Sequence, residues 1–395
     1  MAAAVALSPP QFLRSLFEAA LSAVSAAACV PPHLPDPSSI RGRILVVGAG
    51  KAAAAMAQAV ETAWADHLDR VTGLVVTRYG HGMPTRKIEV VEAAHPVPDA
   101  AGQDAARRIL AAVRGLTADD LVLALMSGGG SALLALPAAG ISLAEKQAKT
   151  RELLMNGASI HEINAARKAM SAIKGGKLAA AAMPARVLTL AISDVPGDDP
   201  ATIASGPTIP APDEPAFSHC ETRVISTARD ALQAAADVAR QAGVVPLILG
   251  DRIEGESREV AKVLAGIALS CKFSSLPMRP PCVILSGGET TVTVHGKGRG
   301  GRNAEFLLAL ALQLKGEPGI DAIACDTDGI DGSEDNAGAT VGPASLDRAE
   351  AQGVDARGRL MDNDAYGFFA VLDDLIVTGP TRTNVNDFRA IYISS

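Results

Sequence analysis

The loop Ser127-Gly-Gly-Gly-Ser131 has the composition of an anion-binding turn. It follows the apolar run Leu121–Met126, which is typical of a buried strand. Three consecutive glycines cost backbone entropy, so such a loop needs unusual dihedral angles or a close ligand. Serine hydroxyls and aligned amides bind phosphate well, and open α/β sheets bind ligands at the carboxyl ends of their strands. A tight turn is the alternative to the phosphate site that we expect at Ser127, Gly128, Gly129, Gly130 and Ser131.

A second glycine turn, Gly48-Ala-Gly50-Lys51, also follows an apolar run. Glycines at such a turn let backbone amides approach a phosphate, and the helix N-terminus adds partial positive charge. The turn has no third glycine at GxGxxG spacing and is not a P-loop, so a plain glycine-rich turn explains it equally well. Lys51 favours an anion-binding site over a plain turn, because a cation on the first turn of a helix is disfavoured unless an anion faces it. We expect Gly50 and Lys51 to bind an anion.

Two aspartate-rich segments also follow predicted strands. In Ser193–Asp199, Asp194 and Asp198 supply carboxylates of the kind that Mg²⁺ and its phosphate ligands require, although a solvated turn is an equally good interpretation. The second segment, Asp326-Thr-Asp-Gly-Ile-Asp331, hints at a Ca²⁺ loop, but its spacing does not fit an EF-hand. For this loop we expect binding of Mg²⁺ or of an adenosine moiety by Asp326, Asp328 and Asp331.

An arginine among glycines marks a further anion site. Arg302 lies at the start of a predicted helix, after Gly298-Arg-Gly-Gly. Its forked donors suit carboxylate or phosphate, and a cation at the positive end of a helix indicates an anionic partner. Helix capping by Asn303 is the structural alternative. Glu289, at the end of Ser286-Gly-Gly-Glu289, brings a carboxylate to another predicted strand end.

Composition excludes several classes of function. The chain has a formal net charge of −7 and no basic run, which argues against nucleic-acid binding. No uninterrupted apolar stretch reaches the roughly 20 residues that a membrane-spanning helix needs. The five cysteines are scattered without CxxC spacing, which indicates a reducing compartment, and no HExxH motif is present. We expect a cytoplasmic protein with no membrane partner.

Apolar strands alternate with longer helical segments through most of the chain, which predicts an α/β fold with a parallel sheet covered on both faces. A chain of 395 residues is more than one core usually spans. The short, proline-rich segment 273–281 separates two such series. We therefore predict one domain over residues 1–275 and a second over residues 276–395.

Taken in order, these loops resemble the type-2 glycerate kinases, whose C-terminal part is called the MOFRL domain. The resemblance runs from about Leu45 to the C-terminus. It also rests on His95-Pro-Val-Pro-Asp, Asn164-x-x-Arg-Lys, Lys174-Gly-Gly-Lys, Ala204-Ser-Gly-Pro-Thr and Thr378-Gly-Pro-Thr-x-Thr-Asn-Val-Asn-Asp387. It implies a Rossmann-like N-terminal domain, a smaller α/β C-terminal domain and an active site in the cleft between them. Arg382 occupies a slot of the last motif that often holds glycine in this family.

The resemblance also implies an activity, the phosphorylation of D-glycerate to 2-phosphoglycerate with ATP and Mg²⁺. Lys51 and Arg302 would be the catalytic cations, and Asp194 would accept the hydroxyl proton. Asp194 and Asp198 would bind Mg²⁺, and the loops at Ser127 and Asp326 would bind ATP. Glu289 and Asn303 are then predicted substrate contacts.

Two other functions stay open from the sequence. Members of this family have been labelled hydroxypyruvate reductase, and an NAD(P)H-dependent reductase needs a GxGxxG turn with an acidic ribose contact. A non-catalytic sugar-acid sensor is the other alternative, although it has no need of several acidic loops. The position of the phosphorylated hydroxyl and the oligomeric state, a homodimer among the options, are not determined by the sequence.

Overall fold

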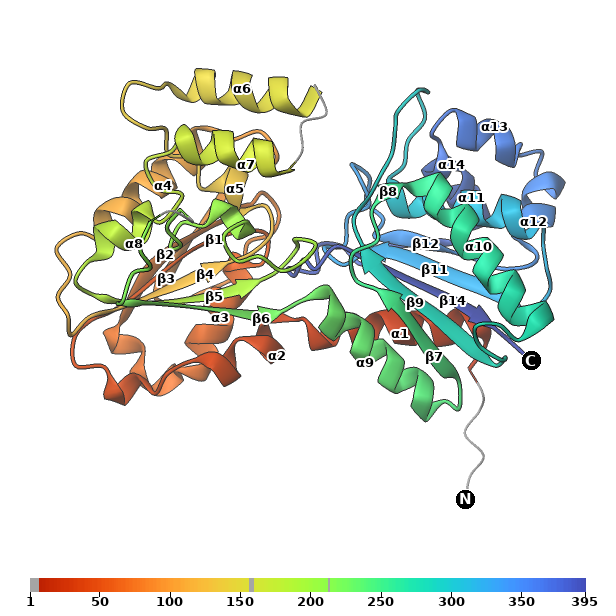
Figure 1. The fold of residues 1–395 in the computed structure, drawn as a ribbon, viewed down its shortest axis with the longest axis horizontal. Coiled ribbons are helices and arrows are strands. Elements are labelled where there is room, and N and C mark those ends of the chain that lie inside the picture. Colours follow the sequence, from red (N-terminus) through yellow and green to blue (C-terminus); the bar gives the residue numbers. More distant parts are fainter. Residues whose placement is uncertain (1–6, 156–159, 212–213) are drawn as a thin grey trace. The chain divides into compact units, whose positions relative to one another are not determined.

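The chain folds into two compact units, each built around its own six-stranded sheet, in a computed structural model that describes residues 7–155, 160–211 and 214–395 (Figure 1). The first, here the N-terminal sheet unit, comprises residues 25–227 and 382–385. The second, here the C-terminal sheet unit, comprises the residues up to Val24 together with 228–381 and 386–395.

All neighbouring strands of the N-terminal sheet unit are parallel, in the order β3-β2-β1-β4-β5-β6. The strand order reverses between β1 and β4, so the chain leaves these two strands toward opposite sides of a switch point. The strands are β1 (Ile44–Ala49), β2 (Val71–Arg78), β3 (Ile88–Ala93), β4 (Leu121–Met126), β5 (Arg186–Ile192) and β6 (Cys220–Ser226).

Helices cover both faces of this sheet, because β1 and β4 are buried along their whole length. Leu45 and Val47 share a core with α4 and α8, and α3 lies on the opposite face in Figure 1. The helices are α2 (Ala26–Cys29), α3 (Ala53–Ala63), α4 (Ala100–Ala112), α5 (Gly130–Leu133), α6 (Leu143–Met155), α7 (Ile160–Ala169) and α8 (Lys177–Ala182), with 3-10 turns at Pro31–His33, Pro37–Ser39, Ala65–Arg70 and Ile203–Ser205.

The C-terminal sheet unit has a mixed sheet in the order β13-β12-β11-β14-β9-β7. Only the β7–β9 pair is parallel, and β14, the last strand of the chain, lies antiparallel between β11 and β9. The strands are β7 (Val245–Gly250), β9 (Cys282–Gly288), β11 (Ile320–Asp326), β12 (Gly338–Val341), β13 (Leu375–Ile376) and β14 (Asp387–Ile393), with a separate pair, β8 (Gly255–Glu256) and β10 (Thr290–Thr291).

The two faces of the mixed sheet are covered by segments from opposite ends of the chain. α10 and α11 pack on one face, with α12 and α14 in the same core. α1 packs with α9 on the other, where the rings of Phe12 and Tyr392 are 5.2 Å apart and those of Phe17 and Phe388 5.6 Å apart (Figure 1). The helices are α1 (Pro9–Ala23), α9 (Ala228–Gln241), α10 (Ser257–Ser274), α11 (Arg302–Leu314), α12 (Ser345–Ala351), α13 (Ala356–Met361) and α14 (Ala365–Leu372).

The predicted α/β fold is confirmed, with a parallel sheet in the first unit and a second, mixed sheet. The compact units nevertheless differ from the predicted domains 1–275 and 276–395. α9, β7 and α10 pack with the C-terminal sheet, and α1 returns to it from the start of the chain. Sequence periodicity reports which residues are buried but not against which sheet, so a single boundary near the proline-rich segment was the simplest prediction.

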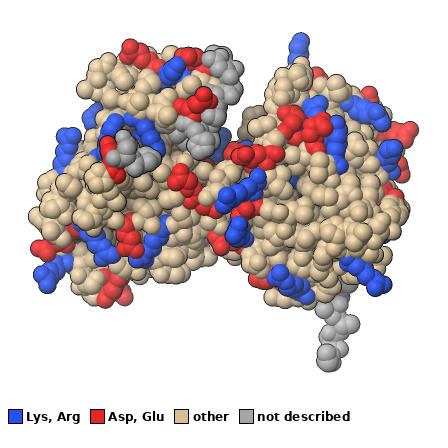
Figure 2. Space-filling view, viewed as in Figure 1, with Lys and Arg blue, Asp and Glu red and all other residues tan. Residues whose placement is uncertain are grey.

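The surface carries charges of both signs. On the face shown in Figure 2, basic and acidic side chains are interspersed over both units, without an extended basic stripe. Among the described residues, no single helix is long and apolar enough to cross a membrane. The bent pair Pro9–Ala23 and Ala26–Ser39 is long and apolar enough only when its two parts are taken together.

Leu16→Ala should destabilise the C-terminal sheet unit, although Leu16 lies at the other end of the sequence. Leu16 is fully buried, and removing a buried leucine side chain typically costs about 2–5 kcal/mol of unfolding free energy. Hydrogen exchange should accelerate in α9 and β14 while β4 keeps its protection. Glu18→Ala, on the exposed side of the same helix, is the control. Faster exchange in β4 but not in β14 would contradict this assignment of α1.

Candidate functional site

Three of the predicted loops begin side by side in the N-terminal sheet unit. In the sheet, Ala49 at the end of β1 pairs with Met126 at the end of β4, and Met126 pairs with Ala191 of β5. The turn at Gly50, the loop at Ser127 and the loop at Ser193 therefore leave the sheet at one level. This edge is the carboxyl end of the parallel strands, next to the switch point, where open α/β sheets bind ligands.

Ser127 fastens the first two loops together. Its hydroxyl is buried and accepts a hydrogen bond from the Ala52 amide at 3.0 Å, and the Lys51 amide donates to the Gly128 carbonyl at 2.8 Å. Gly50 has φ +139°, and a Cβ there would lie 2.1 Å from Ser127 Oγ. The glycine at this position therefore makes room for Ser127. The predicted phosphate contact of Gly50 stays a prediction.

The glycines of the Ser127–Ser131 loop are required by its neighbours. A Cβ on Gly128 would lie 2.1 Å from Asp194 Oδ2 and 2.3 Å from Asn384 Nδ2, and Asn384 donates to Asp194 across 3.1 Å. Gly129 has φ +77°, and a Cβ there would lie 3.4 Å from Lys51 Cγ. The structure thus brings Lys51, the glycine loop and Asp194 into one cluster.

The rest of this loop and the aspartate segment are ordered by local hydrogen bonds. Ser131 Oγ lies 2.7 Å from Ser205 Oγ, in the Ala204-Ser-Gly-Pro-Thr motif. Asp198 has φ +58°, and its amide donates to the Val195 carbonyl at 2.9 Å. Asp198 therefore lies on the same turn as Asp194, but no contact with the glycine loop is found for it among the described residues. Its predicted role in Mg²⁺ binding stays a prediction.

Arg302 lies in the C-terminal sheet unit, at the start of α11, and its anionic partners are carboxylates of the protein itself. Nε donates to Asp387 at 2.6 Å, Nη2 to Asp326 at 2.8 Å and Nη1 to Glu289 at 3.0 Å. Burial alone would lower the pKa of Arg302, but these three carboxylates raise it well above its ordinary value. The protein itself thus provides anionic partners for Arg302, from three separate strand ends, and its predicted contact with a ligand stays a prediction.

Asp387 is the most heavily bonded carboxylate of this cluster. It is buried, and it also accepts hydrogen bonds from Arg389 and from Asn303 Nδ2. Burial would raise the pKa of Asp387, but Arg302 and Arg389 hold it below its ordinary value. Arg389 is itself buried, and its guanidinium lies 5.2 Å from the centre of the Phe306 ring. Asp387 thereby fixes the direction of Arg302.

The Asp326–Asp331 loop is folded around its own backbone. Asp326 accepts the Asp328 amide at 3.0 Å, and Asp328 accepts the Ile330 amide at 2.8 Å. Asp331 is fully buried and accepts the Asn303 and Ala304 amides at 3.0 and 2.8 Å, so it caps α11. Burial raises the pKa of Asp331 to about 6, although these hydrogen bonds work in the other direction.

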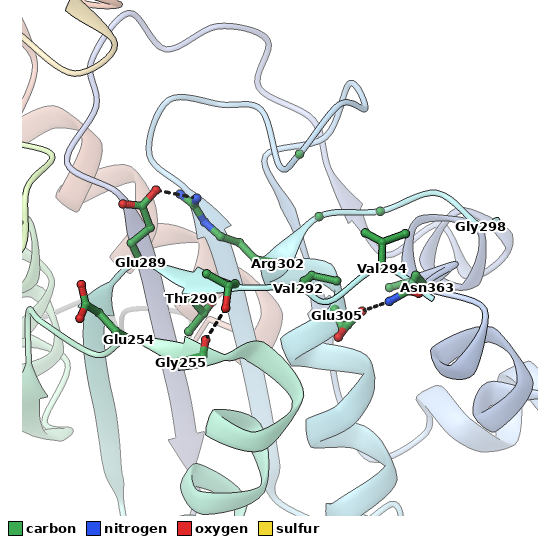
Figure 3. A pocket seen from close by; sticks show the side chains of 15 residues that line it. Glu254, Gly255, Glu289, Thr290, Val292, Val294, Gly298, Arg302, Glu305 and Asn363 are labelled. Carbon is green, nitrogen blue, oxygen red and sulfur yellow. Dashed lines mark hydrogen bonds and ion pairs between the residues drawn. The ribbon is translucent and has the colours of Figure 1, made fainter. Parts of the chain in front are cut away.

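These contacts decide which of the predicted ligand-binding residues in this unit are accessible to a ligand. Asn303 is fully buried, with its amide directed at Asp387 and Asp331. Glu289, by contrast, is exposed, and with Arg302 it lines a cavity of about 740 Å³ that also contacts Glu254, Thr290 and Val292 (Figure 3). The cavity is within the usual size range of small-ligand sites. Glu289 and Arg302 are therefore accessible to a ligand, whereas Asn303 supports them from behind.

Among the described residues, no group of three or more His, Cys, Asp or Glu side chains is arranged to hold a metal ion. Mg²⁺ is usually held by one or two carboxylates together with phosphate oxygens, so a preformed cage is not needed. Asp194 fits that requirement, because its carboxylate lies against the glycine loop.

The sequence did not indicate the importance of Asn384, Asp387 and Arg389. They belong to or follow the C-terminal motif Thr378–Asp387, which resembled a polar turn. Asp387 bonds to Arg302, 85 residues away, and Asn384 bonds to Asp194, 190 residues away. One local signal was available in that motif. Arg382, noted above as a departure from glycine in the resemblance, has φ +60°, a conformation that favours glycine.

This architecture is that of a two-unit α/β protein with a Rossmann-like parallel sheet, at whose switch point the candidate site residues cluster. Residues 12–250 match the family model described as a domain of unknown function, DUF4147, and residues 282–387 match the MOFRL family. The chain belongs to the glycerate 2-kinase family, in which these two domains occur together.

Three relatives illustrate the similarity. A "Putative hydroxypyruvate reductase" of Agrobacterium vitis is 51% identical over 98% of this chain and 95% of its own length. A "D-glycerate 2-kinase" of Thermotoga maritima is 38% identical over 87% of this chain and 89% of its own. The crystal structure of glycerate kinase from Thermotoga maritima superposes with a TM-score of 0.88 at 35% identity, covering 97% of this chain and 99% of that one.

Gly128→Ala should lower the glycerate kinase turnover about 100-fold without unfolding the protein. The new Cβ would overlap Asp194 and Asn384, so the loop or Asp194 must move. A displacement of about 1 Å at a reacting group can cost roughly 100-fold in rate. Gly266→Ala is the control, because nothing lies within 4 Å of a Cβ at that position. Turnover of Gly128→Ala within a factor of two of the wild type would contradict the role of this contact.

Asp387→Asn should destabilise the C-terminal sheet unit by about 3–5 kcal/mol at neutral pH, because Arg302 and Arg389 lose their shared counter-ion. The lowered pKa of Asp387 means that its stabilisation is present above its ordinary pKa of 3.8 and is lost as pH falls through the folded value. The difference in unfolding free energy from wild type, measured in denaturant, should therefore shrink at acidic pH. Glu259→Gln, at an exposed ion pair, is the control. A pH-independent difference would contradict this assignment.

Proposed function

We propose that this protein transfers the γ-phosphoryl group of ATP to the 2-hydroxyl of D-glycerate, with Mg²⁺ present. The observation that carries the proposal is the cluster of Lys51, the Ser127–Ser131 loop and Asp194 at the switch point. The relatives named as glycerate kinases support the choice of substrate. Phosphoryl transfer depends on positioning and on neutralising charge, which glycine loops, a lysine and Mg²⁺ provide.

In this proposal each group of the cluster has a defined task. The Ser127–Ser131 loop binds phosphate oxygens, and Lys51 neutralises charge on the transferring group. Asp194 takes the proton of the attacking hydroxyl as the new P–O bond forms and the bond to the ADP oxygen breaks. Asn384 keeps the Asp194 carboxylate in place through its hydrogen bond. Asp194 and Asp198 would hold Mg²⁺, which would reduce the repulsion between phosphate oxygens.

In the C-terminal sheet unit, we propose that Arg302 is the second catalytic cation. Its guanidinium is held by Asp387 and Asp326, and its third partner, Glu289, is exposed in the cavity. An anionic group of the substrate would replace Glu289 at Nη1 while the other two bonds stay intact. The nucleotide contacts of Asp326, Asp328 and Asp331 remain part of the proposal. Lys51 and Arg302 belong to separate units. That both act as cations in the same reaction is therefore a prediction, which mutagenesis of each residue tests.

A reductase acting on hydroxypyruvate with NAD(P)H is the second candidate. It is favoured by the names of two relatives and by the strand order of the parallel sheet, which is that of dinucleotide-binding folds. Against it, the space beside Gly50 is filled by Ser127, whose hydroxyl also accepts the Ala52 amide. β2 ends in Thr77 and Arg78, so a carboxylate for the ribose of NAD is missing there.

The direct test is ³¹P NMR of the protein with ATP, Mg²⁺ and D-glycerate, beside an NADH assay with hydroxypyruvate. We expect a new phosphomonoester resonance, that of 2-phosphoglycerate. NADH oxidation without that resonance would replace the kinase with the reductase.

Lys51→Ala should lower kcat roughly 100- to 1,000-fold, because it removes a cation from the transferring group. Lys87→Ala, an exposed lysine of the same unit, should leave kcat unchanged. Arg302→Ala should cause a comparable loss, with Arg299→Ala as its exposed control. Near-normal turnover in both Lys51→Ala and Arg302→Ala would overturn the assignment of the catalytic cations.

A further inference from the structure

Two motifs with no task in the proposed reaction bring cations together in the N-terminal sheet unit. Arg167 lies on α7, in Asn164-x-x-Arg-Lys, and Lys174 precedes α8, in Lys174-Gly-Gly-Lys. Lys146 on α6 joins them. Burial and the charges of Lys146 and Arg167 lower the pKa of Lys174 well below its ordinary value. The three cations are therefore close enough to repel one another.

Part of this cluster has a structural explanation. Lys174 Nζ donates to the carbonyls of Ser131 and of Leu134, the latter at 2.9 Å, at the end of α5. Lys177 Nζ donates to the carbonyls of Lys168 and Ser171 at the end of α7. Cations commonly cap the carbonyl ends of helices in this way. Lys174 and Lys177 thus stabilise the fold.

Lys146 and Arg167 have no such explanation. The Lys146 side chain is 3% exposed, and Nζ has no hydrogen-bond partner among the described residues. Burial, Arg167 and Lys177 lower the pKa of Lys146 to about 8, and burial lowers the pKa of Arg167. Neither residue forms an ion pair with a carboxylate in the described part of the chain. Burying an ammonium without a hydrogen-bond partner costs folding free energy. Since no described contact offsets this cost, the cation at this position calls for an explanation other than stability.

The cluster lies at the same edge of the sheet as the glycine loop. Lys174 bonds directly to the backbone of Ser131, the last residue of that loop. Gln147, next to Lys146, donates to the Pro98 carbonyl at 2.7 Å, in the motif that begins at His95. A Cβ on Gly129 would lie 3.1 Å from the His95 ring. The surroundings of Lys146 are therefore linked to the loop from two sides.

We propose that Lys146 and Arg167 form an oxyanion-binding site beside the Ser127–Ser131 loop, which takes a phosphate of the nucleotide or the carboxylate of the hydroxy acid. A bound oxyanion supplies the counter-charge that no described residue provides at this position, and it accepts hydrogen bonds from both cations. The existence of the site follows from the two cations alone, whereas the choice between these two anions rests on the proposed kinase function.

The test measures stability and anion binding without turnover. Lys146→Met should raise the thermal unfolding midpoint of the ligand-free protein, because an unpaired buried charge is removed. It should also weaken binding of inorganic pyrophosphate or of D-glycerate roughly 10- to 100-fold, in calorimetric titrations at constant ionic strength. Arg167→Met should weaken binding of the same anion. Lys149→Met, an exposed lysine of α6 paired with Glu152, should change neither quantity.

The result identifies the anion as well. Weaker binding of pyrophosphate assigns the site to the nucleotide, and weaker binding of D-glycerate assigns it to the carboxylate. Unchanged affinity for both anions in Lys146→Met and Arg167→Met, or binding of neither anion by the wild type, would overturn the proposal. Failure of the kinase function is a separate result, in which these variants weaken anion binding but the wild type forms no phosphomonoester.

Discussion

The close packing at the switch point between β1 and β4 is the constraint on which the rest of the site depends. Parallel pairing ends both strands at one level, so their loops must share a small volume. Glycine at positions 50 and 128 is what allows this, since a side chain at either would overlap Ser127 or Asp194. These glycines allow close contacts within the protein. Those contacts in turn fix the positions of Ser127 and Asp194.

The two units differ in how the positive charges of their lysine and arginine side chains are neutralised. In the C-terminal sheet unit, the buried Arg389 and the partly exposed Arg302 are matched by carboxylates, and Asp387 holds Arg302 in one direction while Glu289 remains exposed. In the N-terminal sheet unit, Lys146 is buried and Arg167 is half-buried, and neither has a carboxylate among its described contacts. A protein that binds anionic substrates benefits from both arrangements, because one is preorganised and the other gains its counter-charge only with the ligand.

Much of this could be predicted from the sequence, because strands followed by glycine or aspartate loops mark the carboxyl edge of a parallel sheet. Ser127–Ser131, Lys51 and Asp194 were predicted in this way as site residues, and the structure places them close to one another. Asp387 and Lys146 were not. Arg302 and Asn303, which donate to Asp387, are distant in sequence, and Lys146 Nζ has no hydrogen-bond partner among the described residues. Periodicity also could not show that α1 and α9 pack on the second sheet, because an amphipathic helix carries no record of its partner.

We propose that nucleotide phosphates bind at the switch point of the N-terminal sheet unit, and hydrogen exchange measured with and without ADP and Mg²⁺ is the decisive test. We expect slower exchange at residues 50–54 and 127–134 in the presence of the nucleotide, with β6 and α9 unchanged. Protection confined to the C-terminal sheet unit, with no change at either glycine loop, would contradict it.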